Sequence, residues 1–152
     1  SLFANDRRVE VRLMDAYQGL KAFLPPRERR GLVFIDSSFD RAEEFKRLAD
    51  GFVEGHRKFA TGIYALWYPL MDAVSMQGFE RRMIATGVRK ILQCELVVRD
   101  VTIAGKVRGC GMLVVNPPFG FDALAATILA YLKPLLAEKN EGFERVRWLV
   151  PE

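Results

Sequence analysis

The order of apolar and polar side chains predicts strands and helices that alternate along the chain. Residues 8–14 alternate with period two and place Val9, Val11 and Leu13 on one face, which predicts a strand. Residues 31–35 are continuously apolar, as expected for a strand that is buried on both faces of a parallel sheet. The same reasoning predicts further strands over residues 61–69, 91–98, 109–116 and 145–150.

Helices are predicted between most of these strands, because apolar residues there recur at helical spacing. The predicted helices cover residues 16–24, 41–59, 71–86 and 121–138. The inner stripe of the second is Phe45, Leu48, Phe52 and Phe59, and that of the third is Met71, Val74, Phe79, Met83 and Ile84. The two strands around residues 91–116 have no helix between them, which predicts an antiparallel pair near an edge. The pattern therefore favours an α/β fold, with a mostly parallel sheet and an antiparallel edge, in one domain over residues 1–152.

Composition narrows the class of protein. The 152 residues carry a formal net charge of +4, which is compatible with a nucleic acid partner but does not require one. His56 is the only histidine, and Cys94 and Cys110 are the only cysteines, so no zinc site is expected. No apolar stretch reaches the roughly 18 residues that a membrane span needs, and the first residues do not resemble a signal peptide. We therefore expect a cytoplasmic protein with free thiols, no metal and no membrane contact; its oligomeric state stays open.

Polar side chains stand where three predicted strands end. Asp15, Asp36 and Asn116 each lie at or just past the end of an apolar strand. Ligands of open α/β sheets bind beyond the carboxyl ends of the strands, so these side chains could converge on one crevice. Each also has a structural interpretation: an acid caps the following helix, and Asn116 with two prolines forms a stiff turn.

The stretch from Asp36 to Asp40 allows two interpretations. Asp36, Ser37, Ser38 and Asp40 are all favoured N-caps, so one of them could begin the helix that follows. Alternatively, the carboxylate of Asp36 accepts a hydrogen bond from a ligand while the ring of Phe39 stacks on the flat face of that ligand. Such stacking is worth ~1–3 kcal/mol per base in nucleic acid complexes.

Five segments of the chain resemble the bacterial RlmJ family, S-adenosylmethionine-dependent methyltransferases that modify N6 of one adenine in 23S ribosomal RNA. The segments are RRGLVFIDSSFD, FATGIYALWYPL, ATGVRKILQCEL, GCGMLVVNPPF and the ending WLVPE. The resemblance implies a Rossmann-like methyltransferase fold. It covers essentially the whole chain but only the C-terminal portion of the family. We therefore expect a fragment or a cleaved product that lacks the family's N-terminal half and most of the cofactor pocket.

The resemblance also implies roles for individual residues. Asp36 matches the catalytic acid that opens the family's Asp-Pro-Pro-Tyr/Phe motif, and Phe39 matches the aromatic position of that motif. Asp15 and Ala16 match an acid and a small residue that contact the cofactor, S-adenosylmethionine. The NPPF segment at residues 116–119 matches a later segment that ends a strand and is not the catalytic loop.

Ser37 and Ser38 are the main departure from the motif, because they stand where the family has two prolines. In the expected chemistry, Asp36 accepts one N6 hydrogen of the adenine and the carbonyl of residue 37 accepts the other. Proline would keep that carbonyl aimed by fixing φ. Two functions follow. One is N6-methylation of 23S ribosomal RNA by an RNA-binding enzyme of rRNA processing. The other is an attenuated or inactive methyltransferase-fold binder of DNA or RNA, with a link to the use of external DNA.

Overall fold

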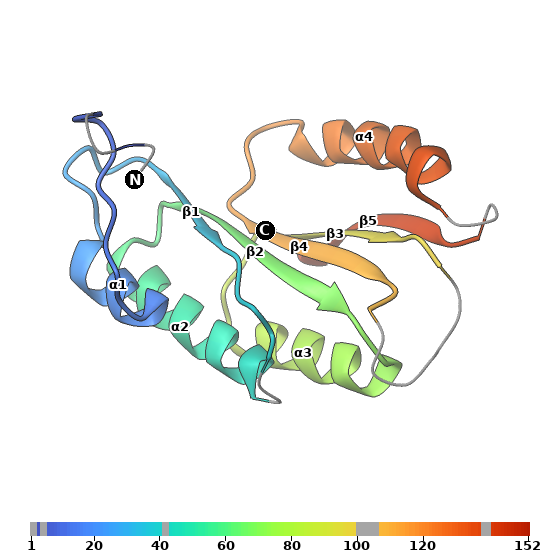
Figure 1. Ribbon diagram of the computed structural model, residues 1–152, viewed down its shortest axis with the longest axis horizontal. Helices are drawn as coiled ribbons and strands as arrows, with labels where there is room; N and C mark the ends of the chain where they lie inside the picture. Colours follow the sequence, from blue (N-terminus) through green and yellow to red (C-terminus); the bar gives the residue numbers. More distant parts are fainter. Residues whose placement is uncertain (1–2, 4–5, 41–42, 100–106, 138–140) are drawn as a thin grey trace.

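A mixed five-stranded sheet forms the centre of the molecule in the computed structural model, which describes residues 3, 6–40, 43–99, 107–137 and 141–152 (Figure 1). The strands are β1 (Leu32–Ile35), β2 (Ile63–Leu70), β3 (Ile91–Val97), β4 (Gly109–Val115) and β5 (Phe143–Val150). Their order across the sheet is β1-β2-β4-β3-β5. β1 and β2 run parallel, and each of the other neighbouring pairs is antiparallel.

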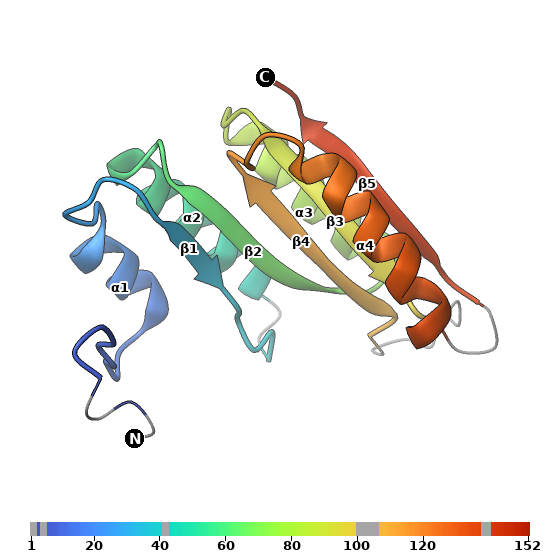
Figure 2. The same cartoon turned by 90° about the horizontal axis from the view of Figure 1, so that it is seen from above.

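Helices cover both faces of this sheet. They are α1 (Ala16–Phe23), α2 (Glu44–Lys58), α3 (Ala73–Ala85) and α4 (Phe121–Leu136). α2 and α3 lie against one face, with α1 packed beside α2, and α4 lies over β3 and β5 on the other face (Figures 1 and 2). Leu48 and Phe52 of α2 and Phe79 and Met83 of α3 are fully or almost fully buried against the sheet. Apolar side chains at helical spacing thus place both helices as the sequence predicts.

The prediction of a mostly parallel sheet is wrong. Only the β1–β2 pair is parallel within the described sheet, because the chain turns back after β3 and inserts β4 between β2 and β3. The antiparallel pairing of residues 91–97 with 109–115 is confirmed, and β5 adds outside β3 as the edge strand.

Residues 8–14 do not form the predicted strand. Val11 and Leu13 are exposed, and short side-chain ion pairs join Arg8 to Asp6 and Arg12 to Glu10. Alternation of apolar and polar residues produces a strand only where a neighbouring strand accepts its backbone hydrogen bonds, and the described chain offers none here.

Burial of β1 and of α3 also departs from the prediction. Leu32 and Phe34 are 63% and 55% exposed, because one edge and part of one face of β1 are uncovered in the described chain. In α3 the predicted stripe is only partly right, since Val74 and Ile84 are exposed.

Candidate active site

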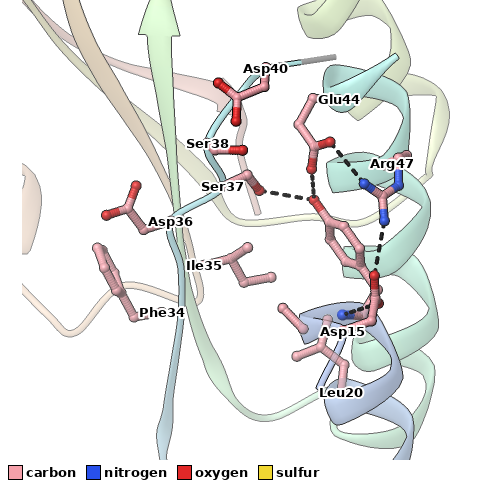
Figure 3. Close-up of a pocket in the computed structure, with 12 residues that line it drawn as sticks. Asp15, Leu20, Phe34, Ile35, Asp36, Ser37, Ser38, Asp40, Glu44 and Arg47 are labelled. Atoms are coloured by element: carbon pink, nitrogen blue, oxygen red, sulfur yellow. Dashed lines mark hydrogen bonds and ion pairs between the residues drawn. The ribbon is translucent and has the colours of Figure 1, made fainter. Parts of the chain in front are cut away.

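A cavity of about 550 Å³ lies at the carboxyl end of β1, between this strand, the start of α1 and the start of α2 (Figure 3). It is lined by Asp15, Ala16, Tyr17, Leu20, Phe34, Ile35, Asp36, Ser37, Ser38, Asp40, Glu44 and Arg47. Its size falls within the ~300–1,000 Å³ that small-molecule and cofactor sites occupy. The cavity brings together Asp15, Ala16, Asp36, Ser37 and Ser38, although the strand that was predicted to end at Asp15 does not form and Asp15 directly precedes α1.

Asp36 follows the last residue of β1, is exposed and is among the residues that line this cavity; its side chain is directed to the side of the chain away from Asp15 and Arg47 (Figure 3). Side chains alternate along the extended chain, so Phe34 and Asp36 lie on one side of it and Ile35 and Ser37 on the other (Figure 3). No described residue donates a hydrogen bond or an ion pair to the carboxylate of Asp36. The start of α2 does not depend on it either, because the N-cap of that helix is Glu43, without a side-chain cap. Asp36 is thus an acceptor available to a ligand.

Asp15 plays the capping role that the sequence allows. Its carboxylate accepts hydrogen bonds from the backbone N–H groups of Tyr17 (3.0 Å) and Gln18 (3.1 Å), which begin α1. The other carboxylate oxygen lies 3.0 Å from the guanidinium of Arg47. The backbone hydrogen bond from Gln18, followed by that from Tyr17 and the charge of Arg47, holds the pKa of Asp15 below its usual value. Capping leaves Asp15 part of the cavity wall, so a structural and a ligand-binding role coexist here.

A side-chain network connects Asp15 to the turn that follows β1. Arg47 pairs with both Asp15 and Glu44, in each case at 3.0 Å. Glu44 also accepts a hydrogen bond of 2.7 Å from the hydroxyl of Tyr17, and that hydroxyl lies 2.9 Å from Oγ of Ser37 (Figure 3). Burial, with a contribution from the Glu44 carboxylate, raises the pKa of Tyr17 to about 12.

Sequence reasoning missed Tyr17, Glu44 and Arg47. A partial signal was present, since Glu44 and Arg47 stand three residues apart on an amphipathic helix and Tyr17 directly follows the Asp15-Ala16 pair. Nothing in the local pattern, however, indicates that α1 and α2 bring these side chains to the same turn.

The structure does not bring Phe39 into the cavity wall. Its half-buried ring packs on Phe45, with ring centroids 4.8 Å apart, and on Trp67 at 5.9 Å. Its backbone has φ of 53°, in the left-handed region that bulky residues rarely adopt. Packing between β2 and α2 therefore holds this residue in a strained conformation. Stacking of Phe39 on a substrate base has no support in this arrangement.

Asn116 lies away from the cavity, beside the beginning of β2 and not beyond the end of β1. β4 is antiparallel to β2, so the end of β4 lies beside the beginning of β2. The side-chain amide of Asn116 donates to the carbonyls of Ala60 (2.8 Å) and Gly62 (2.9 Å) just before β2. The structural interpretation of the NPPF turn thus describes its role here, and the expected convergence of Asn116 with the two acids is wrong.

Within the described ranges, no cluster of three or more histidine, cysteine or acidic side chains has a geometry suited to a metal ion. The same part of the chain contains no helix with the length and apolarity to cross a bilayer.

Known proteins resemble this chain over its whole length. Residues 1–150 match the family described as "RsmJ: Ribosomal RNA large subunit methyltransferase D, RlmJ". The chain is 39% identical over 152 residues to the "Ribosomal RNA large subunit methyltransferase J" of Escherichia coli K12. The matched region covers 100% of this chain and 54% of that protein. The protein of the same name from Haemophilus influenzae is 37% identical over 150 residues. This match covers 99% of this chain and 53% of that protein.

A solved structure supports the fold. A crystal structure of a Legionella pneumophila protein superposes with a TM-score of 0.81 at 31% identity, covering 89% of this chain and 49% of that one. The chain therefore spans about half the length of the relatives that it matches.

Proposed function

Since the chain belongs to the RlmJ family of ribosomal RNA large subunit methyltransferases, we propose that its cavity is part of an active site for S-adenosylmethionine-dependent N6-methylation of an adenine in 23S ribosomal RNA. One observation carries the proposal. Asp36, whose carboxylate has no hydrogen-bond or ion-pair partner among the described residues, lines the same cavity as Asp15 and Ala16, the pair that the family resemblance assigns to the cofactor.

The chemistry requires an acceptor at this place. The amine of adenine is a poor nucleophile because its lone pair is delocalised into the ring. Asp36 accepts one N6 hydrogen, and the backbone carbonyl of Ser37 accepts the other, so that the nitrogen moves toward tetrahedral geometry. A positioned acceptor of this kind contributes typically 10²–10⁴-fold to the rate. The same carboxylate offers a route for the proton that leaves the nitrogen.

The lining of the cavity fits the proposed cofactor, which supplies the methyl group when it is bound. S-Adenosylmethionine carries a sulfonium and an ammonium against a single carboxylate. Four acidic residues and one arginine are among the residues that line the cavity: the acids are Asp15, Asp36, Asp40 and Glu44, and the arginine is Arg47. This acidic wall attracts a cation, and Leu20 and Ile35 add apolar surface for a flat ring.

The same acidic wall constrains how RNA approaches. Phosphate groups are repelled from a cavity lined by carboxylates, whereas a neutral base is not. The target adenine therefore enters as a base that is flipped out or already single-stranded, with its phosphates outside the cavity.

Methyl transfer to a 23S ribosomal RNA fragment tests the proposal, with the full-length protein. Asp36→Ala is expected to lower kcat by at least ~100-fold. Asp50→Ala is the matched control, because Asp50 is an exposed acid of α2 that does not line the cavity. Cofactor binding, measured by calorimetry, should be retained in both variants. Turnover of Asp36→Ala equal to that of the wild type would remove Asp36 from the mechanism. An inactive wild type that still binds RNA would favour the non-catalytic binder.

A further inference from the structure

The hydroxyl of Tyr17 lies at the centre of the network beside the catalytic turn. It has one hydrogen, and the charged acceptor Glu44 at 2.7 Å takes it. The contact of 2.9 Å with Ser37 must then run the other way, with Oγ–H of Ser37 donating to the oxygen of Tyr17. Ser37 is therefore tied by its side chain to an oxygen whose orientation Glu44 fixes.

The oxygen of Tyr17 is itself held from several sides. Glu44 is 4% exposed, and its second oxygen is occupied by Arg47. The guanidinium of Arg47 also lies 5.0 Å from the centre of the Tyr17 ring. The ring also packs against Gly51 of α2, where an added Cβ would come within 2.2 Å of the ring, so the ring fills the space that this glycine leaves. Tyr17 is thus a rigid support and not a mobile surface side chain.

We propose that Tyr17 and Glu44 are positioning residues that hold the Asp36-Ser37 turn through the hydroxyl of Ser37. This inference rests on the proposed function above. In this chain a side-chain hydrogen bond does the work that a fixed proline φ does in the family motif. It keeps the carbonyl of Ser37 and the carboxylate of Asp36 aimed at the same amine. A misplacement of about 1 Å can cost ~100-fold in rate, so the restraint has a catalytic consequence.

A double-mutant cycle in the full-length protein tests this restraint. Tyr17→Phe removes the hydroxyl but keeps the ring on Gly51, and Ser37→Ala removes the other partner. Each is expected to lower kcat about tenfold, the factor that corresponds to one hydrogen bond, with KM for the cofactor changed less than about twofold. Because both remove the same contact, the double variant should also lose about tenfold and not about a hundredfold.

Rescue and a matched control separate positioning from general stability. Ser37→Pro restores stiffness without a hydroxyl, so adding Tyr17→Phe to it should cost less than about twofold in kcat. Tyr64→Phe is the control. It also deletes a tyrosine hydroxyl that makes one hydrogen bond, to the carbonyl of Phe59, but lies outside the cavity. Its kcat should stay within about twofold of the wild type.

Amide hydrogen exchange of residues 36–39 gives a readout that does not depend on catalysis. Exchange should be faster in Tyr17→Phe and Ser37→Ala than in the wild type and in Tyr64→Phe. An inactive wild type would overturn the proposed function, and the exchange rates would still decide whether the network holds the turn. Unchanged exchange, or multiplicative losses of kcat in the double variant, would overturn the positioning role while leaving the proposed function standing.

Discussion

Two polar networks in this molecule use the same kinds of side chain in different ways. Each joins a tyrosine hydroxyl to a glutamate and the glutamate to an arginine. In the first, Tyr17 donates to Glu44, and the network ends at a cavity where a neighbouring carboxylate has no described partner. In the second, Tyr68 of β2 donates to Glu95 of β3 at 2.8 Å, deep within the sheet.

The second network is closed. The carboxylate of Glu95 is buried and receives Tyr68, the amide of Gln93 at 2.9 Å, and the guanidinium of Arg145 at 2.9 Å. Arg147 and Glu80 complete it through further hydrogen bonds to Gln93. Burial raises the pKa of the Tyr68 hydroxyl above its ordinary value, so it stays a donor. A network whose members satisfy one another stabilises the fold, and a network that leaves an acceptor facing a cavity marks a candidate site.

The largest expected effect comes from deleting one acid from each region in the full-length protein. Glu95→Ala leaves the guanidinium of Arg145 and the hydroxyl of Tyr68 without their acceptor, and should lower the free energy of unfolding by about 3 kcal/mol. Asp36→Ala should leave that free energy within about 0.5 kcal/mol and abolish turnover. Denaturant unfolding and methyl transfer, measured on both variants, check the contrast. If Asp36→Ala were as destabilising as Glu95→Ala, the two regions would not differ as described.

The sequence predicted those features that depend on neighbours along the chain. Apolar periodicity is enough to find α2 and β3, and the end of β1 places Asp36 at the cavity. Asp15 reaches the same cavity as the N-cap of α1, because the strand that was predicted before it does not form. The sequence also predicts that β3 and β4 are antiparallel, but the expectation for Asn116 did not take this pairing into account. Because β4 is antiparallel to β2 as well, it ends beside the beginning of β2 and places Asn116 away from Asp36.

The side-chain contacts that define the site could not be predicted from the local sequence pattern, for a different reason. Tyr17 meets Ser37 and Glu44 across 20 and 27 residues of chain, so the contact exists only after α1 docks on α2. Likewise, the motif places an aromatic residue at Phe39, but the direction of its ring is set by packing on Phe45 and Trp67. The sequence therefore identified the residues near the turn, but it did not predict how their side chains are oriented.

A smaller change in the free energy of unfolding is expected from the strained turn at Phe39. The second network lies mainly on strands and has no such turn. Phe39→Ala should lower the free energy of unfolding by about 2 kcal/mol, because it deletes half-buried contacts with Phe45 and Trp67. Phe39→Gly removes the same ring but adopts φ of 53° without strain, so it should be more stable than Phe39→Ala by about 1 kcal/mol. Thermal unfolding of the two variants tests this order, and the reverse order would show that the residue is not strained.

The smallest effect is the pH dependence that Asp15 contributes to the first network. The folded pKa of Asp15 lies below its unfolded value, so its contribution is fully present above about pH 4 and is lost as the pH falls through the folded pKa. Asp15→Asn keeps a good N-cap for α1 but cannot titrate. The difference in unfolding free energy between pH 6 and pH 3 should therefore be smaller in Asp15→Asn than in the wild type. Asp50→Asn is the control, since Asp50 is an exposed acid that pairs with Lys46 on the surface of α2. Equal acid sensitivity in Asp15→Asn and the wild type would mean that the charge of Asp15 contributes nothing to the cap or to Arg47.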